Sequence, residues 1–396
     1  MRPASMIVAG VMSGTSADGI DVALVKIAAP SADRSLPQLR LLAHRAFPYP
    51  RALRSAILAA MAGQSDTPNT TTQALARLHW RLGLAYAEAL QATIRDTKIN
   101  PALIGCHGQT VYHQGLPVTY ASRRFSCTWQ LGEPAVIVAT CGLPVVSNFR
   151  PGDMALGGQG APLVPLFDYA SFVHPTRARI LLNIGGIANL TVVPAGAPLE
   201  QVTAFDTGPG NMIIDALTQQ LFERPLDRNG RIAARGRILE PVLAAALKEK
   251  FFRLAPPKSA GREQFGGARA ATFLAACRRY SQRPEDAIAT ATAFTAQSTA
   301  DAIRAWVLPH TQSAPVDLIV SGGGARNATL LAMLGNRLVP LDLNLAAADA
   351  IGLPSAAKEA AAFALLAYQT WHRRPGNIPS ATGASRPAVL GQITYA

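Results

Sequence analysis

Apolar and polar positions come in alternating blocks along the chain, and these blocks predict strands and helices in turn. The stretch MIVAGVMSGTSADGIDVALVKI, residues 6–27, is an apolar run, a short polar segment rich in glycine and a second apolar run. This pattern predicts two strands joined by a tight turn. Apolar residues spaced three and four apart then predict helices over residues 52–61 and 71–96.

The rest of the chain continues the alternation. Residues 103–106 predict a buried strand that runs into a polar loop, and the stretch after residue 134 predicts a helix, a strand over 145–148 and a long glycine-rich loop. Strands are predicted at 180–184 and 188–193, around a Gly185-Gly186 turn. The stretches VTAFDTGPGNMIIDALTQQLF and VDLIVSGGGARNATLLAMLGNRL each predict a strand, a glycine-rich turn and a helix, and KEAAAFALLAYQTW predicts a long helix.

Strands that alternate with helices indicate an α/β protein. The strand, glycine turn and strand of residues 6–27 recur at 180–193, which favours two duplicated lobes. We expect an N-terminal lobe over residues 1–140, completed by part of the C-terminal segment, and a C-terminal lobe over residues 141–396.

Composition narrows the functional classes. The content of hydrophobic residues is 49% and that of charged residues 15%, which suits a large core and excludes a disordered chain. The formal net charge is +13, but the basic residues are scattered, so we expect a phosphate-bearing ligand and no nucleic acid. The four cysteines form no CxxC pair, and no apolar run reaches the ~18 residues of a membrane span. These features predict a soluble cytoplasmic protein with no membrane partner.

The first glycine turn has the chemistry of a phosphate site. Glycine lets backbone N–H groups approach an anion, and Thr15 and Ser16 add hydroxyl donors. Asp18 and Asp21 would repel a bare phosphate but suit one bridged by Mg²⁺. The turn is no Walker P-loop, because it lacks GK[ST] and a strand follows it. Taken alone, it fits an ordinary glycine-rich β-turn equally well.

Two further glycine turns precede predicted helices, where backbone N–H groups can also bind phosphate. They contain Asp206, Thr207, Gly208, Gly210 and Asn211, and Ser321, Gly322, Gly323 and Gly324. Several such turns at strand ends fit one nucleotide bound between two lobes.

Seven segments together resemble the anhydro-N-acetylmuramic acid kinase family. They are GVMSGTSADGID, NFRPGDMALGGQGAPLVP, LLNIGGIANLT, FDTGPGNMIIDA, PPKSAGRE, SGGGARN and PGNIPSATGAS, and they run in order over nearly the whole chain. The resemblance implies two ribonuclease-H-like lobes of the sugar kinase, Hsp70 and actin superfamily, with ATP in the central cleft. It also implies an enzyme that uses ATP and water to open the 1,6-anhydro ring of its sugar and phosphorylate O6, in peptidoglycan recycling.

The resemblance also assigns residues. Asp153 matches the catalytic carboxylate, which would take a proton from the attacking water. His107, Gln109, Gly158, Gln159 and Glu359 are expected to contact the sugar. Mg²⁺ is expected on the ATP phosphates, with Asp18 and Glu359 as possible protein ligands. The ATP-binding residues implied are Gly14, Thr15, Ser16, Ala17, Asp18, Gly19, Ile20, Asp21, Gly185, Gly186, Asp206, Gly208, Gly210, Asn211, Gly322, Gly323 and Gly324.

Three positions depart from the family pattern. Asn148 and Glu133 stand where Asp is usual, and Ala356 stands where an Asp often precedes the glutamate. Asn148 carries no charge, so we assign it no acid or base role, and Ala356 argues against a metal site made of two carboxylates there.

Several readings stay open. His107 is equally a satisfied loop histidine, Asp153 and Glu359 fit solvated surface positions, and Lys258 and Arg262 either bind an anion or cap helices. A different sugar or carboxylate kinase of the same superfamily is the nearest alternative function, and an Hsp70-like nucleotide-gated binding module is another. The family also suggests a homodimer.

Overall fold

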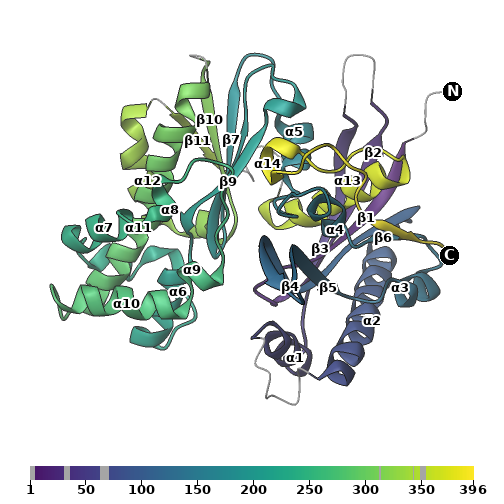
Figure 1. Ribbon diagram of the computed structural model, residues 1–396, viewed down its shortest axis with the longest axis horizontal. Coiled ribbons are helices and arrows are strands. Elements are labelled where there is room, and N and C mark those ends of the chain that lie inside the picture. Colours follow the sequence, from purple (N-terminus) through teal and green to yellow (C-terminus); the bar gives the residue numbers. More distant parts are fainter. Residues whose placement is uncertain (1–4, 31–35, 63–70, 312–313, 342, 348–353) are drawn as a thin grey trace. The chain divides into compact units, whose positions relative to one another are not determined.

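The computed structural model describes residues 5–30, 36–62, 71–311, 314–341, 343–347 and 354–396, and the chain divides into two compact units. Unit 1 comprises Met1–Ser171 and Ala356–Ala396, and unit 2 comprises Phe172–Ser355 (Figure 1). The division thus falls after Ser171 and not after residue 140 as expected, because β6 (Val145–Ser147) pairs with the sheet of unit 1. Asp153 therefore belongs to unit 1.

Each unit is built on one mixed sheet, and five strands of the first sheet follow the same order as the five strands of the second. In unit 1 the order is β12-β6-β4-β1-β2-β3, with β5 paired to β4 outside this path. In unit 2 it is β11-β10-β7-β8-β9. Besides β6, the strands are β1 (Met6–Ser13), β2 (Gly19–Ala28), β3 (Gln38–Pro48), β4 (Leu103–Tyr120), β5 (Arg123–Leu131), β7 (Ala178–Ile184), β8 (Ile187–Val193), β9 (Thr203–Pro209), β10 (Val316–Ser321), β11 (Leu343–Ala347) and β12 (Gln392–Thr394).

Strand directions repeat as well. The first strand of each sheet, β1 or β7, is antiparallel to the next strand in the chain and parallel to β4 or β10. The second and third strands are antiparallel, and the fourth and fifth, β4 with β6 and β10 with β11, are parallel. This duplication confirms the α/β class with two ribonuclease-H-like sheets.

The helices cover the sheets and connect the strands. Those of unit 1 are α1 (Arg51–Ala62), α2 (Thr72–Thr97), α3 (Pro134–Cys141), α4 (Arg150–Met154), α5 (Pro165–Phe172), which ends at the unit boundary, α13 (Lys358–Trp371) and α14 (Pro379–Thr382). Those of unit 2 are α6 (Met212–Phe222), α7 (Glu240–Leu247), α8 (Lys250–Arg253), α9 (Arg262–Phe265), α10 (Gly267–Arg278), α11 (Pro284–Trp306) and α12 (Ala328–Leu338).

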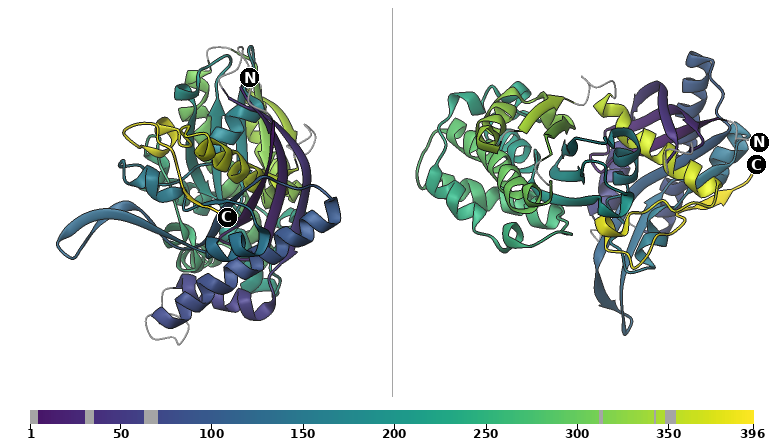
Figure 2. Two further views of the ribbon diagram at one scale, coloured as in Figure 1. Left: turned by 90° about the vertical axis from the view of Figure 1, so that its right-hand side faces the viewer. Right: turned by 90° about the horizontal axis from the view of Figure 1, so that it is seen from above.

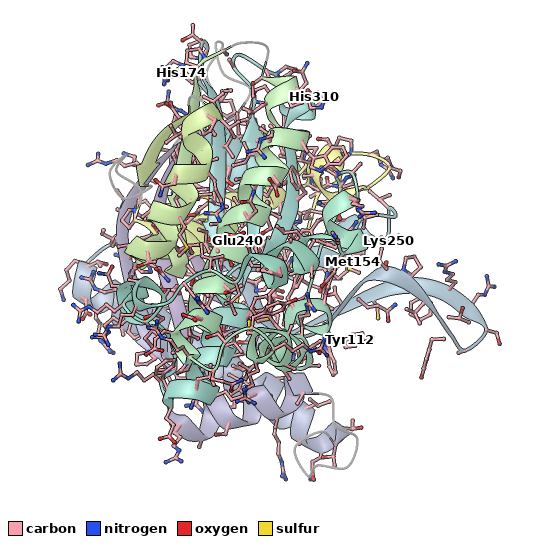
Figure 3. All side chains as sticks on the ribbon, turned by 90° about the vertical axis from the view of Figure 1, so that its left-hand side faces the viewer. Tyr112, Met154, His174, Glu240, Lys250 and His310 are labelled. Carbon is pink, nitrogen blue, oxygen red and sulfur yellow. The ribbon has the colours of Figure 1, made fainter. Side chains whose placement is uncertain are left out.

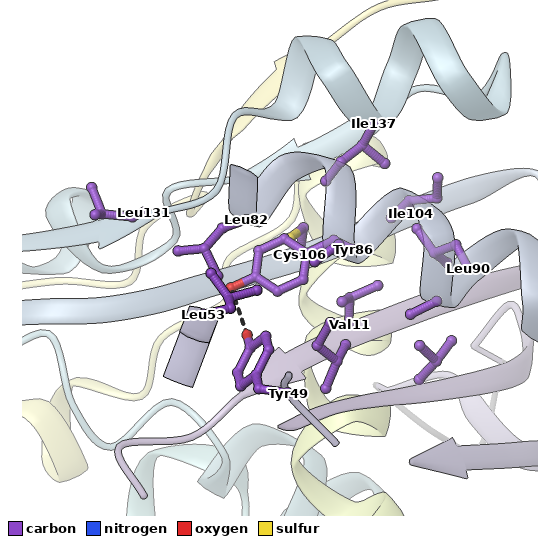
Figure 4. Packing of buried hydrophobic residues seen from close by; sticks show 14 of the residues in the cluster. Val11, Tyr49, Leu53, Leu82, Tyr86, Leu90, Ile104, Cys106, Leu131 and Ile137 are labelled. Atoms are coloured by element: carbon purple, nitrogen blue, oxygen red, sulfur yellow. Dashed lines mark hydrogen bonds between the residues drawn. The ribbon is translucent and has the colours of Figure 1, made fainter. Parts of the chain in front are cut away.

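Helix α2 covers one face of the sheet in unit 1. Leu82, Tyr86 and Leu90 follow one side of the helix at spacings of four residues and are fully buried against β1 and β4 (Figure 4). Full burial of each such side chain contributes about 1.5–3 kcal/mol. The hydroxyl of Tyr86 lies 3.5 Å from that of Tyr49, close enough for a long hydrogen bond, so its polar end is not left unpaired in this core.

Helix α13 covers the other face and comes unusually close to the sheet. A Cβ atom on Gly10 of β1 would lie 1.8 Å from the carbonyl oxygen of Ala360, and one on Gly105 of β4 would lie 2.3 Å from that of Phe363. Only glycine fits at these two strand positions. The close contact fixes the start of α13 beside the end of β1, and Glu359 lies at that start.

Two loops predicted from the sequence are wrong. The polar segment after residue 106 continues β4 to Tyr120 and forms a long antiparallel ribbon with β5. Its polarity arises because most of the ribbon is exposed, so no apolar run marks it. The glycine-rich segment after residue 148 contains the short helix α4 before the turn of Gly157 and Gly160, both at positive φ.

The other predicted elements are confirmed to within a few residues: β1, β2, α1, α2, α3, β6, β7, β8, β9, α6, β10, α12 and α13. The search for a membrane-crossing helix, made over the described residues, found none that is both long and apolar enough.

Candidate functional site

The turn between β1 and β2 exposes some of its predicted ligand-binding residues and buries others. Thr15, Ser16 and Asp18 are exposed, whereas the side chains of Ala17 and Ile20 belong to the core of unit 1. Ala17 has φ +53°, and its N–H donates to the carbonyl of Gly14 at 3.1 Å, which closes the turn tightly. Ala17 and Ile20 therefore offer a ligand only backbone groups.

Both carboxylates of this segment already have basic partners. Asp18 Oδ1 lies 3.2 Å from Nη2 of Arg54, whose Nε also donates to the carbonyl of Ala17 at 3.1 Å. Asp21 Oδ1 lies 2.8 Å from Nε2 of His44. These pairs lower the repulsion that two carboxylates would exert on a phosphate at this turn.

A chain of buried polar groups supports the same turn from below. The hydroxyl of Ser13 donates to Gln109 Oε1 at 2.6 Å, and it accepts a hydrogen bond of 2.8 Å from Tyr49. The Nε2 of Gln109 donates to the carbonyl of Gly14 at 3.2 Å. The Gln109 side chain has no exposed surface, so it holds the turn in place rather than presenting its amide to solvent.

Asp153, the predicted catalytic carboxylate, is held from three sides. Its Oδ1 accepts hydrogen bonds of 2.7 Å from both Asn377 Nδ2 and Thr382 Oγ1, and its Oδ2 accepts one of 2.8 Å from the backbone N–H of Gly160. The side chain has no exposed surface. A carboxylate oxygen has two lone pairs, so Oδ2 keeps one for a proton while Oδ1 is saturated.

The loop after α4 packs directly against the carboxylate of Asp153. A Cβ atom on Gly158 would lie 2.2 Å from Asp153 Oδ2, so only glycine fits there. The N–H of Gln159 donates to the carbonyl of Thr382 at 2.8 Å, which ties the loop to the C-terminal segment. Gly158 and Gln159, both predicted to contact the sugar, are thus placed beside Asp153.

His107 and Arg150 form a second buried contact in unit 1. Nδ1 of His107 lies 2.7 Å from the carbonyl oxygen of Gly108, so it carries the proton, and Nε2 accepts hydrogen bonds from Arg150 Nε at 3.0 Å and Nη2 at 2.8 Å. Burial and the nearby guanidinium keep the pKa of His107 well below its usual value. His107 is therefore neutral, and its direct partner is Arg150.

Arg150 is a buried cation for which the sequence predicted no role. Its Nη1 donates to the carbonyl of Gly160 at 2.7 Å, and burial lowers its pKa to about 10, against the opposing charges of Glu359 and Asp153. Within the described part of the chain no carboxylate forms an ion pair with it. Three of its five N–H groups are used, which leaves one on each Nη, the pair that binds a carboxylate or phosphate with two hydrogen bonds.

Glu359 lies at the start of α13 and is exposed, unlike Asp153. Neighbouring protein groups partly desolvate the carboxyl and so raise its pKa; Arg150 and Lys358 oppose this shift, and Asp21 adds to it. The neighbouring Lys358 is buried and pairs with Asp168 at 2.7 Å, which anchors this end of the helix.

The three predicted glycine turns of unit 2 come together. The N–H groups of Gly210 and Asn211 donate to the carbonyls of Gly186 and Gly185, both at 2.8 Å. A Cβ atom on Gly322 would lie 2.7 Å from the carbonyl oxygen of Ile184, immediately before Gly185. The glycine turns therefore cluster at the N-terminus of α6, the kind of helix end at which anions bind, and the N–H groups of Gly210 and Asn211 are used in holding the cluster together.

Asp206 and Lys258 lie close to these turns. Asp206 Oδ2 accepts a hydrogen bond of 2.7 Å from the N–H of Ala260, and burial raises its pKa to about 7 against the charge of Lys258. Lys258 donates to the carbonyl of Phe251 at 3.2 Å and lies over its ring at 4.8 Å. The side chain of Arg262 lies outside the described residues.

The three departures have local structural settings. Asn148 is exposed at φ +57°, a backbone conformation that Asn tolerates better than most residues, and its Nδ2 donates to Gln392 at 3.3 Å. Glu133 caps α3 through the N–H of Ala135 at 2.9 Å and contacts His79 at 3.1 Å. Ala356 is exposed just before α13.

Two hydrogen-bond partners of Asp153, Asn377 and Thr382, were also not predicted from the sequence. Both lie in the segment PGNIPSATGAS, which the resemblance had marked, but nothing in the spacing shows that it folds back onto residue 153. Among the described residues no group of three or more His, Cys, Asp or Glu could hold a metal ion.

Comparison with known proteins agrees with the family resemblance. The sequence profile of the family described as "Anhydro-N-acetylmuramic acid kinase" matches residues 6–396. Curated proteins of that name from Bacillus cereus (strain AH187) and Bacillus thuringiensis subsp. konkukian (strain 97-27) are each 42% identical to the chain over 393 residues, covering 98% of this chain and 99% of the relative. Among solved structures, the Clostridium difficile 2-hydroxyisocaproyl-CoA dehydratase activator with bound ADPNP covers 92% of this chain and 95% of its own at 10% identity, with a TM-score of 0.43.

Proposed function

The chain belongs to the anhydro-N-acetylmuramic acid kinase family and is a phosphotransferase of cell-wall recycling, and from this premise we propose how its residues carry out the reaction. The substrates are 1,6-anhydro-N-acetylmuramic acid, ATP and water, and the products are N-acetylmuramic acid 6-phosphate and ADP. The oxygen of water bonds to C1 of the sugar, the C1–O6 bond breaks, and O6 takes the γ-phosphoryl group.

We propose that Arg150 binds the carboxylate of the lactyl group that distinguishes muramic acid from glucosamine. The support is the pair of unused N–H groups on Nη1 and Nη2, in a guanidinium whose other side is fixed by His107 and Gly160. A bidentate pair of this kind orients the sugar as well as holding it.

We propose that Asp153 takes the proton that water loses as it attacks C1. Its support is the free lone pair on Oδ2 and the rigid hold on Oδ1 by Asn377 and Thr382, which aims the carboxylate. Glu359 is the second candidate for acid or base work, because it is exposed and its pKa is raised.

For the nucleotide, we propose that its phosphates bind backbone N–H groups of the glycine turns. Support in unit 2 comes from the convergence of Gly186, Gly210 and Gly322, and in unit 1 from the tight turn at Gly14–Ala17. Mg²⁺ neutralises phosphate charge in such reactions. The described protein groups offer it few carboxylates, so we propose that the phosphates themselves hold most of its ligand sphere, with Asp18 or Glu359 adding one contact each.

We further propose that the enzyme acts as a homodimer in the cytoplasm on small molecules alone. The support is its kinship to metabolic kinases, and this proposal is independent of the residue roles above.

The single observation that carries the reaction is 42% identity over nearly the whole of both chains to proteins of this name. Its test is ADP release with the anhydro sugar and, in parallel, with open N-acetylmuramic acid. We expect turnover with the anhydro sugar and incorporation of one oxygen from ¹⁸O-labelled water at C1. Faster phosphorylation of the open sugar would assign the chain to the ordinary sugar kinases.

A further inference from the structure

Helix α11 carries five buried hydroxyl groups. The helix belongs to unit 2, which Figure 2 draws in teal and green, and it contacts α6, α7, α12 and β9. The hydroxyl residues are Thr290, Thr292, Thr295, Ser298 and Thr299, and each has at most 2% of its surface exposed. Burying a hydroxyl costs stability unless the group forms a hydrogen bond, so the partners of these groups show why the helix carries them.

Three of the hydroxyls donate within their own helix. Thr290, Thr292 and Ser298 donate to backbone carbonyls three or four residues earlier in α11, at 2.6, 2.9 and 3.2 Å. Thr290 also accepts a hydrogen bond of 3.0 Å from the N–H of Leu239, the residue before Glu240 at the start of α7 (Figure 3). Hydrogen bonds to the preceding turn are usual for threonine and serine in a helix, and they satisfy these groups locally.

Thr295 donates to another part of the chain. Its Oγ1 lies 2.8 Å from the carbonyl oxygen of Gly210, 85 residues earlier, and 3.5 Å from that of Ala291 in its own helix. A hydroxyl has a single hydrogen, and the shorter distance identifies Gly210 as its acceptor. Gly210 is itself buried, so the loss of Thr295 would remove a partner from a carbonyl that lies away from water.

The peptide group between Gly210 and Asn211 is therefore held at both ends. Its oxygen accepts the hydrogen bond from Thr295, and its N–H donates to the carbonyl of Gly185 at 2.8 Å. The N–H of Gly210 donates to the carbonyl of Gly186, also at 2.8 Å. Because a peptide group is planar and turns as one unit, freeing its oxygen would also loosen the bond at its N–H. Thr295 thus fixes the turn after β9 against the turn between β7 and β8.

A second hydroxyl of α11 contacts the same turn. The Oγ1 atoms of Thr299 and Thr207 lie 3.3 Å apart, and Thr207 also donates to the carbonyl of Ala188 at 3.2 Å. Since the hydroxyl of Thr207 has one hydrogen, Thr299 is the donor between the two. Thr295 and Thr299 are four residues apart and so lie on one face of the helix, which supports the turn at two points.

We propose that Thr295 is a positioning residue for nucleotide binding. It acts through the carbonyl of Gly210, by which it fixes the glycine turns of unit 2 in the arrangement that binds phosphate. This role rests on the proposed function, which assigns the phosphates of ATP to these turns. Valine at position 295 keeps nearly the same side-chain shape but has no donor, so the turns can shift and bind phosphates more weakly.

The test compares T295V with T292V, which removes a buried hydroxyl whose hydrogen bond stays within the same helix. Calorimetric titration of the full chain with the magnesium complex of AMP-PNP, an ATP analogue that is not hydrolysed, gives the dissociation constant. We expect T295V to raise it about 10-fold, as the loss of one partner of a buried carbonyl implies. T292V is expected to bind like wild type, and T295S, which keeps the hydroxyl, to restore most of the affinity.

T295A also lacks the donor and guards against a packing effect of one variant, and thermal unfolding without nucleotide shows whether each variant folds. The KM for the anhydro sugar at saturating ATP is expected to stay unchanged in all of them. A dissociation constant that T295V and T295A leave unchanged, or that T292V raises equally, overturns the inference alone. Wild type that binds no AMP-PNP overturns the proposed nucleotide site as well, so the two failures are distinguishable.

Discussion

The imidazole Nε2 of His107 accepts two hydrogen bonds from the guanidinium of Arg150, at 3.0 and 2.8 Å. The histidine thus positions the positively charged side chain. A protonated His107 would have no lone pair for Arg150 and would place two positive charges together. The pair therefore holds only while His107 is neutral.

This requirement predicts a pH dependence of stability. The pKa of His107 in the folded protein lies well below the ~6.5 of an unfolded chain, so the unfolded state binds the proton first. Stability is then retained above pH 6.5 and lost as the pH falls below it, by at most about 1.4 kcal/mol for each pH unit from this residue. Denaturant unfolding of wild type and H107Q between pH 7 and 5 measures it. If the free energy of unfolding changes equally with pH in wild type and H107Q, the prediction is contradicted.

Because His113 also has a lowered pKa, of about 4, H113Q serves as the control. H113Q removes the contribution of His113 to the pH dependence of the unfolding free energy but leaves that of His107.

Arg150→Lys keeps the charge but loses the planar fork. We expect the KM for 1,6-anhydro-N-acetylmuramic acid to rise by about 10- to 100-fold, as loss of a charge-assisted bidentate contact implies. The comparison substrate is 1,6-anhydro-N-acetylglucosamine, which has no lactyl carboxylate. If R150K raises the KM for both sugars by the same factor, Arg150 does not bind the lactyl carboxylate.

Asp153→Asn tests the proposed base. We expect ATP binding near that of wild type and turnover reduced by about 10²- to 10⁴-fold, the usual range for loss of general base catalysis. Since Asp153 is buried among three donors, its variant is also assayed by thermal unfolding, which separates a lost base from a disordered loop.

E359Q is made in parallel. Should it abolish turnover while D153N retains it, Glu359 would be the base and Asp153 an anchor of the loop.

Gly158→Ala inserts a methyl group 2.2 Å from Oδ2 of Asp153 and must displace either the carboxylate or the loop. We expect turnover to fall by about 100-fold because a displacement near 1 Å at the reacting group has that effect. Gly157→Ala is the control for backbone strain in this loop: its Cβ meets no atom within 4 Å, so its cost comes from an alanine at φ +83° and not from contact with Asp153. Turnover of G158A no lower than that of G157A would contradict a specific effect of the contact between Gly158 and Asp153.

The spacing of apolar residues predicted the helices and strands that bury one face. It failed for the ribbon of β4 and β5, most of which is exposed and carries no such spacing. Helix α2 and strands β7 and β8 lie where the pattern put them, to within about two residues. The ribbon of β4 and β5 was predicted as a loop because its register depends on cross-strand pairing, which a single strand does not show. The expected boundary at residue 140 differs from the division after Ser171 because β6 pairs with β4 in the first sheet, and a strand's own sequence does not show which sheet it joins.

For the site, the sequence indicated Asp153 and the glycine turns but not their supports. Arg150, Asn377 and Thr382 have unremarkable neighbours, and they matter because the fold brings them to residues 107 and 153. Gln109 was predicted to contact the sugar, and the structure shows it beneath the turn at Gly14 instead. Its role as a substrate ligand remains a prediction that its burial does not favour.

Unit 1 is interrupted by the whole of unit 2, and this order has a consequence for synthesis. Thr382 leaves the ribosome 229 residues after Asp153, and the helix that fits against Gly10 and Gly105 also follows unit 2 in the chain. During translation, the face of the first sheet that α13 covers therefore stays unpacked until the whole of unit 2 has been synthesised. The buried carboxylate of Asp153 acquires its full set of donors only after the segment that follows unit 2 has been synthesised, so a nascent chain that lacks this segment cannot hold Asp153 as the folded protein does.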